Sequence, residues 1–175
     1  MKKLIVLLAI MMPGAMTAQF PEHKPDPELM KLKFMTGEWV GSGWIRFPGM
    51  PKVPLKSKES VSLQAGGNAL SVAGYHTTLN PSTGKQVPVH DAFAVITWTG
   101  EHYRFNASLA TGNHGDYKGR FDDGKFVWGY ENQWQGKVRY TIGLNDKGQW
   151  QEIGEASRDG NIWTQFFELT LNKKL

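Results

Sequence analysis

A run of about ten short segments, each rich in aromatic and β-branched residues, begins at residue 38 and continues almost to the end of the chain. This composition is typical of β-strands. The segments lie near residues 38–47, 56–65, 69–79, 87–98, 102–110, 115–121, 125–132, 137–145, 149–157 and 161–172. Hairpin residues such as Asp122-Asp123-Gly124 separate them, and short links of this kind join antiparallel neighbours. The sequence therefore predicts an all-β protein with an up-and-down strand order.

Alternation along the segments gathers apolar side chains on one face. The sets that share a side are Trp39/Gly41/Gly43/Ile45/Phe47, Tyr103/Phe105/Ala107/Leu109, Phe126/Trp128/Tyr130, Val138/Tyr140/Ile142/Leu144 and Trp163/Gln165/Phe167/Leu169/Leu171. About ten strands in one sheet leave two exposed edges unless the sheet closes, and closure gives every apolar face a shared interior. We therefore expect a single antiparallel barrel of about ten strands. A sandwich of two sheets is the structural alternative.

A short helix is expected just before the first strand. Asp26 can accept a hydrogen bond from a free backbone N–H, and Pro27 suits the first helical position, which needs no donor. Three apolar residues then recur at near-helical spacing: Leu29, Leu32 and Met35. Gly37 follows, and it allows the left-handed conformation in which many helices end. The pattern predicts a helix of about two or three turns with one apolar face.

The first eighteen residues have the layout of a secretory signal peptide. Lys2 and Lys3 precede an apolar run over residues 4–12, and small residues lead to Ala18. The run has about half the ~20 residues that span a bilayer, so we expect no stable membrane anchor after cleavage. The interpretation is a signal peptide at residues 1–18, one lipocalin-like barrel domain at residues 19–175, and a periplasmic or secreted protein.

Charge and motifs exclude several classes of function. The formal net charge is +4, and it is spread without a basic block, so we expect no nucleic-acid partner. The histidines form no H-x-H or H-E-x-x-H spacing, and no G-x-S-x-G motif or cysteine is present. We therefore expect no metal and no cofactor, and little support exists for hydrolysis through a covalent intermediate.

The segment Phe34-Met35-Thr36-Gly37-Glu38-Trp39, a short helix followed by Gly-x-Trp, resembles the opening of the calycin superfamily of lipocalins and fatty-acid-binding proteins. The chain as a whole also looks like the bacterial, uncharacterised DUF1579-type proteins. This resemblance implies a small barrel in which Gly37 and Trp39 are the structural motif. It also implies that Trp39 packs across one end of the cavity, often against a basic side chain from a late strand. Arg139 and Arg158 are both candidates for that partner.

Aromatic content is the strongest sequence signal for a binding site. The chain has Trp 7, Tyr 5 and Phe 9, and many of these lie on the inferred inner face. Such rings can line a pocket for an apolar or aromatic molecule. The residues expected to form the wall of that pocket are Trp44, Tyr75, Phe93, Phe105, Trp128, Tyr140 and Phe167. The leading hypothesis is therefore an exported barrel that binds a small apolar ligand.

Two alternatives remain open at this point. A cavity enzyme of isomerase or hydratase type would use a pocket carboxylate or histidine as acid or base. Its candidates are His76 and His90, which lie on adjacent segments joined by one hairpin, and the late-strand carboxylates Glu131, Glu152, Glu155 and Glu168. An envelope interaction protein would instead have a filled barrel and an exposed apolar patch.

Overall fold

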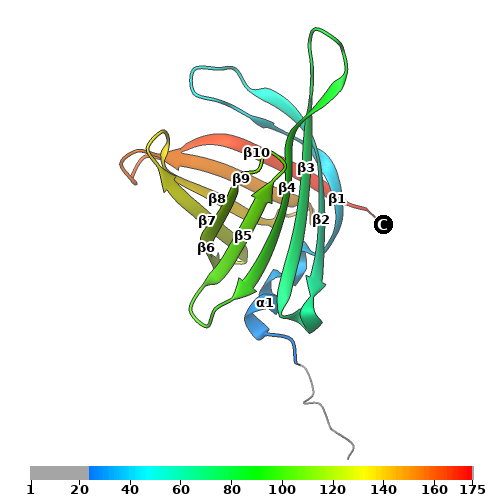
Figure 1. Ribbon diagram of the computed structural model, residues 1–175, viewed down its shortest axis with the longest axis vertical. Helices are drawn as coiled ribbons and strands as arrows, with labels where there is room; N and C mark the ends of the chain where they lie inside the picture. Colours follow the sequence, from blue (N-terminus) through cyan, green and yellow to red (C-terminus); the bar gives the residue numbers. More distant parts are fainter. Residues whose placement is uncertain (1–23, 175) are drawn as a thin grey trace, which may run out of the picture.

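The computed structural model describes residues 24–174, and in it ten antiparallel strands close into one barrel (Figure 1). The predicted fold class is confirmed, and the sandwich is wrong because β1 pairs with β10 and leaves no edge between two sheets. The predicted signal peptide and the start at Gln19 lie outside the described residues. They stay predictions.

Strand order follows the chain around the barrel. The strands are β1 (Gly37–Ile45), β2 (Val53–Gln64), β3 (Ala69–Leu79), β4 (Gln86–Trp98), β5 (Tyr103–Leu109), β6 (His114–Asp122), β7 (Lys125–Asn132), β8 (Gly136–Leu144), β9 (Trp150–Ser157) and β10 (Thr164–Lys173). One 3-10 turn, η2 (Ala65–Gly67), links β2 and β3. β2 begins at Val53, before the expected residue 56. Pro54 disfavours a strand in the sequence pattern, but proline is tolerated this close to a strand end.

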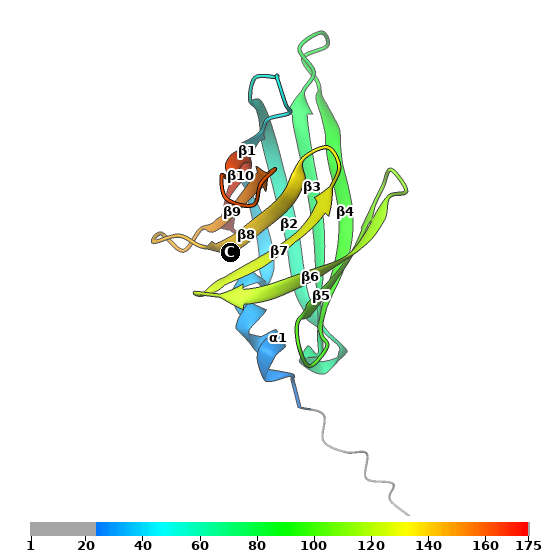
Figure 2. The ribbon, with the colours of Figure 1, turned by 90° about the vertical axis from the view of Figure 1, so that its left-hand side faces the viewer.

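A short helix closes one end of the barrel, as expected. It consists of α1 (Pro27–Lys31) and the 3-10 turn η1 (Leu32–Met35), and Asp26 caps it by accepting from the backbone N–H of Glu28 at 2.8 Å. The predicted apolar face of Leu29, Leu32 and Met35 is fully buried. Figures 1 and 2 show α1 at the end of the barrel away from the β1–β2 and β3–β4 hairpins. Among the helices of residues 24–174, none is long and apolar enough to cross a membrane.

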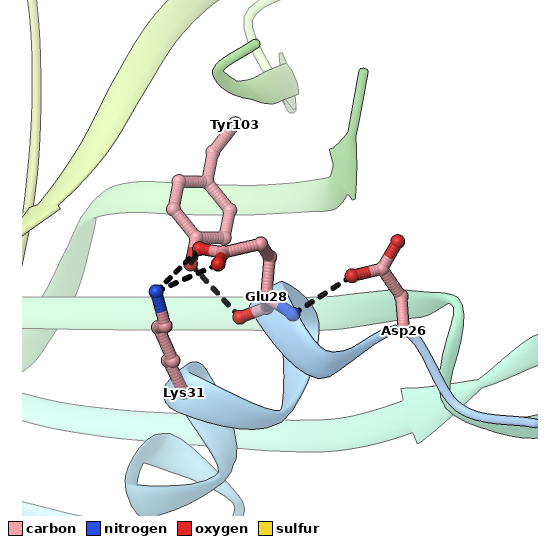
Figure 3. A network of polar contacts seen from close by, with 4 residues as sticks. All are labelled: Asp26, Glu28, Lys31 and Tyr103. Atoms are coloured by element: carbon pink, nitrogen blue, oxygen red, sulfur yellow. Dashed lines mark hydrogen bonds and ion pairs between the residues drawn. The ribbon is translucent and has the colours of Figure 1, made fainter. Parts of the chain in front are cut away.

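One buried tyrosine fixes this helix to the barrel wall (Figure 3). The hydroxyl of Tyr103, on β5, donates to the backbone carbonyl of Glu28 at 2.8 Å. The Glu28 carboxylate is held in turn by Lys31, whose Nζ lies 2.7 Å from Oε1. Burial and the neighbouring Glu28 raise the pKa of Tyr103, so its hydroxyl stays a donor. The end of the barrel is therefore closed by apolar packing together with a directional hydrogen bond.

Trp39 packs in the core beside this helix, as the resemblance implied. Its side chain is 2% exposed, and its Nε1 donates to the carbonyl of Met35 at 2.8 Å. Its ring lies 5.8 Å from that of Trp150. The basic partner is Lys173, whose Nζ lies 5.3 Å from the Trp39 ring centroid. β10 supplies this residue because it pairs with β1 in a register that places Lys173 opposite Trp39.

The two arginines expected as partners of Trp39 are elsewhere. Arg139 lies over the Trp163 ring at 4.0 Å, and the guanidinium of Arg158 is 3.4 Å from the carbonyl oxygen of Trp134. Neither candidate is the partner, because Arg139 lies on β8 and Arg158 follows β9, whereas the strand that closes on β1 is β10.

A β-bulge in β10 changes the faces expected near its start. Phe167 pairs with Gly154, but Gln165 pairs with Glu155, and the extra residue between them is Phe166. Since Gly154 and Glu155 point to opposite faces, Phe167 and Gln165 do so as well. The prediction that Gln165 and Trp163 share the inner face with Phe167 is therefore wrong. An extra residue shifts strict alternation by one position.

Replacing Trp39 should test its place in the core. We expect Trp39→Ala to lower the free energy of unfolding by about 3–5 kcal/mol, the usual cost of deleting a large buried aromatic side chain. His114→Ala is the control, because His114 is exposed and its loss should cost within about 0.5 kcal/mol. Denaturant titrations measure both variants, and equal midpoints would contradict the assigned packing.

Candidate functional site

The barrel interior encloses a cavity with two lobes. The inner lobe has a volume of about 290 Å³ and reaches Met35, at the end closed by the helix. The outer lobe has about 200 Å³ and reaches Phe47 and Val89. Those two side chains are 50% and 52% exposed, so the outer lobe extends to the surface. Five residues line both lobes, and they are His76, His90, Trp128, Tyr140 and Glu152. The barrel is therefore hollow along much of its length.

Aromatic rings from four consecutive strands form one wall of the inner lobe. The Trp128 and Tyr140 rings stack at 4.6 Å with an interplanar angle of 11°. Trp128 also lies 4.5 Å from Phe105 and 5.2 Å from Tyr117. The rings meet because the strand register pairs Phe105 with Tyr117 and Trp128 with Tyr140. Tyr130 extends this wall, with its ring 5.5 Å from that of Tyr117.

Four of the seven predicted wall residues line the cavity. Phe105 lines the inner lobe, Phe167 the outer lobe, and Trp128 and Tyr140 line both. These four follow the alternation that the sequence shows. The register brings their strands together, as the meander predicted.

The other three predicted wall residues, Trp44, Tyr75 and Phe93, line neither lobe. Each alternates with inward neighbours and so points outward. Tyr75 is 40% exposed and Phe93 is 52% exposed, while Trp44 packs under Lys52, whose Nζ lies 3.4 Å from the ring centroid. The expectation for these three residues rests on their aromatic type and not on alternation. Alternation alone places Trp44 on the other face of β1 from Trp39 and Gly43.

Four titratable side chains complete the cavity lining. They are Glu59 on β2, His76 on β3, His90 on β4 and Glu152 on β9. The strand register pairs His76 with His90, and their rings stack at 4.7 Å. Nε2 of His76 lies 3.8 Å from Oε1 of Glu59. Gly74 makes room for this carboxyl group, because a Cβ there would lie 2.9 Å from each Glu59 oxygen. We call Glu59, His76, His90 and Glu152 the polar cluster.

Enclosure shifts every member of the polar cluster toward its uncharged form. Burial, together with the nearby Glu152, raises the pKa of Glu59 well above its usual value. Burial lowers the pKa of His76 to about 4, and it also lowers the pKa of His90. The 3.8 Å distance between Glu59 Oε1 and His76 Nε2 is too long for a hydrogen bond. Burial raises the pKa of Glu152 to about 7, so this carboxyl group titrates near neutrality.

The interior also holds hydrogen-bonding groups without partners. In the described part of the chain, three buried side-chain atoms have no hydrogen-bond partner: Oγ of Ser57, Nδ1 of His76 and Nε1 of Trp128. His76 and Trp128 line the cavity, and the register places Ser57 beside His76. Buried polar groups in folded proteins are nearly all hydrogen-bonded, to protein or to water. The cavity therefore presents unused capacity for a polar guest.

Glu59 was missed by the sequence reasoning, although a signal was present. It alternates with Leu55, Ser57 and Val61 along β2, which puts it on the inner face. The candidates Glu131, Glu155 and Glu168 do not line the cavity, while His76, His90 and Glu152 do. Glu155 points outward and pairs with Arg139 at 2.8 Å. Across residues 24–174, no group of three or more His, Cys, Asp or Glu side chains could hold a metal ion.

A wider cleft of about 690 Å³ lies at the rim of the barrel, outside the polar cluster. Its lining includes the exposed side chains of Met50, Trp134 and Ile162, from three different loops. Phe47 lines both this cleft and the outer lobe of the cavity. The cleft is larger than the interior lobes, and its lining includes Arg46, Arg158 and Asp159 but no member of the polar cluster. We therefore regard it as the approach to the cavity.

Comparison with known proteins supports the fold alone. No family model matches the chain, and no curated protein matches it. Among solved structures, the crystal structure of Rv2717c from M. tuberculosis is similar, with a TM-score of 0.61 and 11% sequence identity. The match covers 87% of this chain and 100% of that chain. The resemblances to the calycin superfamily and to DUF1579-type proteins stay predictions.

The enclosure of Glu152 should be visible in the pH dependence of stability. Its folded pKa, about 7, lies above its ordinary value of 4.5, so its contribution to stability is full below 4.5 and is lost as pH rises through 7. Relative to Glu152→Gln, the free energy of unfolding of the wild type should fall by up to about 3 kcal/mol between about pH 4.5 and pH 8. Denaturant midpoints across this range measure the difference.

Glu155→Gln is the matched control for this experiment. It makes the same chemical change on the same strand, but its side chain points outward to Arg139. The control should keep the wild-type pH profile. A constant difference between wild type and Glu152→Gln would show that Glu152 is well solvated.

Proposed function

We propose that this protein binds one small, largely aromatic molecule inside its barrel, and that it does so outside the cytoplasm. The observation that carries the proposal is the two-lobed cavity, with an aromatic wall on one part of its lining and the polar cluster on another. The inner lobe is at the lower end of the range of about 300–1,000 Å³ for ligand pockets, which favours a small guest. Export rests on the first eighteen residues of the sequence.

The aromatic wall suits a planar ligand. Phe105, Trp128 and Tyr140 lie within 4.6 Å of a neighbouring ring in this wall, and offset or edge contacts with a further ring add about 0.5–1.5 kcal/mol beyond apolar burial. A polar substituent on the same ligand would meet the polar cluster. Such a combination of apolar walls with a few placed polar groups is typical of small-molecule sites.

Titration with naphthylethanol, an aromatic probe with a polar end, tests this proposal. Tryptophan emission should change on binding, because Trp128 and Trp150 both line the inner lobe. We expect a micromolar dissociation constant, equivalent to about −8 kcal/mol, that a chelator does not alter.

Ala92→Leu should weaken this binding by at least about tenfold, because Ala92 lines the inner lobe and a larger side chain would occupy it. Phe93→Leu is the control, since the neighbouring Phe93 is on the outer face. Failure of the probe to bind, or equal loss in both variants, would contradict a site inside the barrel.

An acid–base enzyme is the second candidate, because the half-buried Glu152 and the buried His76 both line the cavity. A carboxyl group with a pKa of about 7 is suited to exchange protons with a bound substrate near neutrality. Acetonaphthone, an aromatic ketone with an exchangeable methyl group, is a suitable probe. If this candidate is right, deuterium from heavy water enters that methyl group faster with the protein than without it, and Glu152→Gln abolishes the difference.

A further inference from the structure

The carboxyl groups in the cavity lining can give the cavity a negative charge. Two carboxyl groups, Glu59 and Glu152, face the inner lobe, and among the described residues that line either lobe none is Lys or Arg. The histidines of the polar cluster do not supply a positive charge, because burial lowers the pKa of each. An anionic guest would therefore meet two carboxyl groups and no compensating cation.

A cationic guest would meet the opposite situation. Each carboxyl group is held toward its neutral form by burial, and Glu152 further raises the pKa of Glu59, so the pair resists double ionisation. A positive charge placed beside Glu152 would stabilise its carboxylate form. The attraction is stronger inside the barrel than in water, because the effective dielectric constant is lower there.

The aromatic wall also favours a cation. Tyr117, Trp128, Tyr130 and Tyr140 present their rings to the same inner lobe that Glu59 and Glu152 line. Their centroids are separated by 4.6 to 6.4 Å within the wall. The face of an aromatic ring carries negative potential and attracts cations within about 6 Å, most strongly for Trp. Grouped aromatic rings are the usual protein solution for recognising organic ammonium groups.

His76 offers a hydrogen-bonding atom to a guest in this lobe. His76 is 6% exposed and lines the cavity, yet its Nδ1 has no hydrogen-bond partner. Its other ring nitrogen is 3.8 Å from Glu59, beyond hydrogen-bond distance. A neutral imidazole can accept a hydrogen bond from an ammonium group through whichever nitrogen carries no proton.

We propose that the preferred ligand is a small aromatic amine or N-heterocycle, bound as its cation between the aromatic wall and the carboxyl groups Glu59 and Glu152. This inference rests on the proposed function and adds the charge class of the ligand. On binding, the ammonium form enters from water and Glu152 releases its proton to solvent, so charge is balanced inside the barrel. Fatty acids and aromatic carboxylates are disfavoured on the same grounds.

Three probes that share one ring system isolate the contribution of charge. Naphthylethylamine, naphthylethanol and naphthylacetate are cationic, neutral and anionic, and isothermal titration calorimetry measures their dissociation constants. At about pH 8 we expect the amine to bind at least tenfold more tightly than the alcohol, and the carboxylate at least tenfold more weakly. At about pH 6, where Glu152 is mostly protonated, titrations in buffers of different ionisation enthalpy should show net proton release for the amine alone.

Lower pH should reduce the preference for the amine. At about pH 5.5 Glu152 is mostly neutral, so the ratio of alcohol to amine dissociation constants should shrink at least about fivefold. The other titratable groups that face the inner lobe are Glu59 from β2, His76 from β3, His90 from β4, Tyr117 from β6, Tyr130 from β7 and Tyr140 from β8. Protonation of either histidine would act in the same direction, and burial keeps Tyr130 and Tyr140 neutral.

Glu152→Gln keeps the shape of the side chain and removes its charge. It should abolish the amine preference and the proton release, so that the amine and the alcohol bind with dissociation constants within about twofold of each other. A cooperative unfolding transition in denaturant shows that the variant is folded. Glu155→Gln, on the outer face of the same strand, should behave as the wild type.

Each outcome separates this inference from the proposed function. If naphthylethanol binds inside the barrel but the amine binds no better, or if naphthylacetate binds best, the charge assignment is wrong and the ligand-binding function stands. An amine preference that survives Glu152→Gln unchanged also overturns it. If none of the three probes binds, both proposals fail together.

Discussion

Closure of the sheet between β1 and β10 is the constraint on which the rest of the structure depends. The pairing runs from Trp39 to Ile45 and leaves neither strand with a free edge. It requires the two backbones to approach closely at Gly43, where any Cβ would collide with the main chain of Glu168. Once closed, the barrel has an inside and an outside, and alternation assigns every side chain to one of them.

That assignment explains how residues far apart in the sequence form one cavity. Inward positions on β5 to β8 carry large rings, and inward positions on β2, β3, β4 and β9 carry the polar cluster. Cross-strand register then sets the finer geometry. The stacked pair of Trp128 and Tyr140 and the stacked pair of His76 and His90 are both directly opposed residues on neighbouring strands.

Period-two alternation and hairpin residues are local properties of the chain, and they were enough to predict the strands and their order. The closed sheet was predicted from the cost of two exposed edges. The capped helix was likewise predictable from Asp26 to Met35. Lys173 as the partner of Trp39 was not, since it follows from the register of two strands at opposite ends of the sequence. The outward orientation of Gln165 could not be predicted either, because a bulge adds one residue without leaving a distinctive pattern in the sequence.

The site was predicted where alternation was followed and missed where residue type replaced it. Four aromatic residues at inward positions line the cavity: Phe105, Trp128, Tyr140 and Phe167. Trp44, Tyr75 and Phe93 are aromatic as well, but they lie at outward positions and do not line it. Glu59 lies at an inward position but is a charged residue type that is rarely buried, so composition argued against it. Its pKa and its contact with His76 arise only from three-dimensional enclosure, which no local pattern records.

Stability alone does not account for the polar cluster. Burying Glu59 and His76 without a hydrogen bond between them costs free energy that burying an apolar pair of similar size would not. The barrel could be filled with the same kinds of apolar residues that surround Leu169 and Leu171, yet it is hollow where these polar groups converge. Places where a sequence departs from the most stable local choice are commonly places where it binds or reacts. In this barrel the departure, the cavity and the aromatic wall coincide, and that coincidence is the physical argument for a ligand site there.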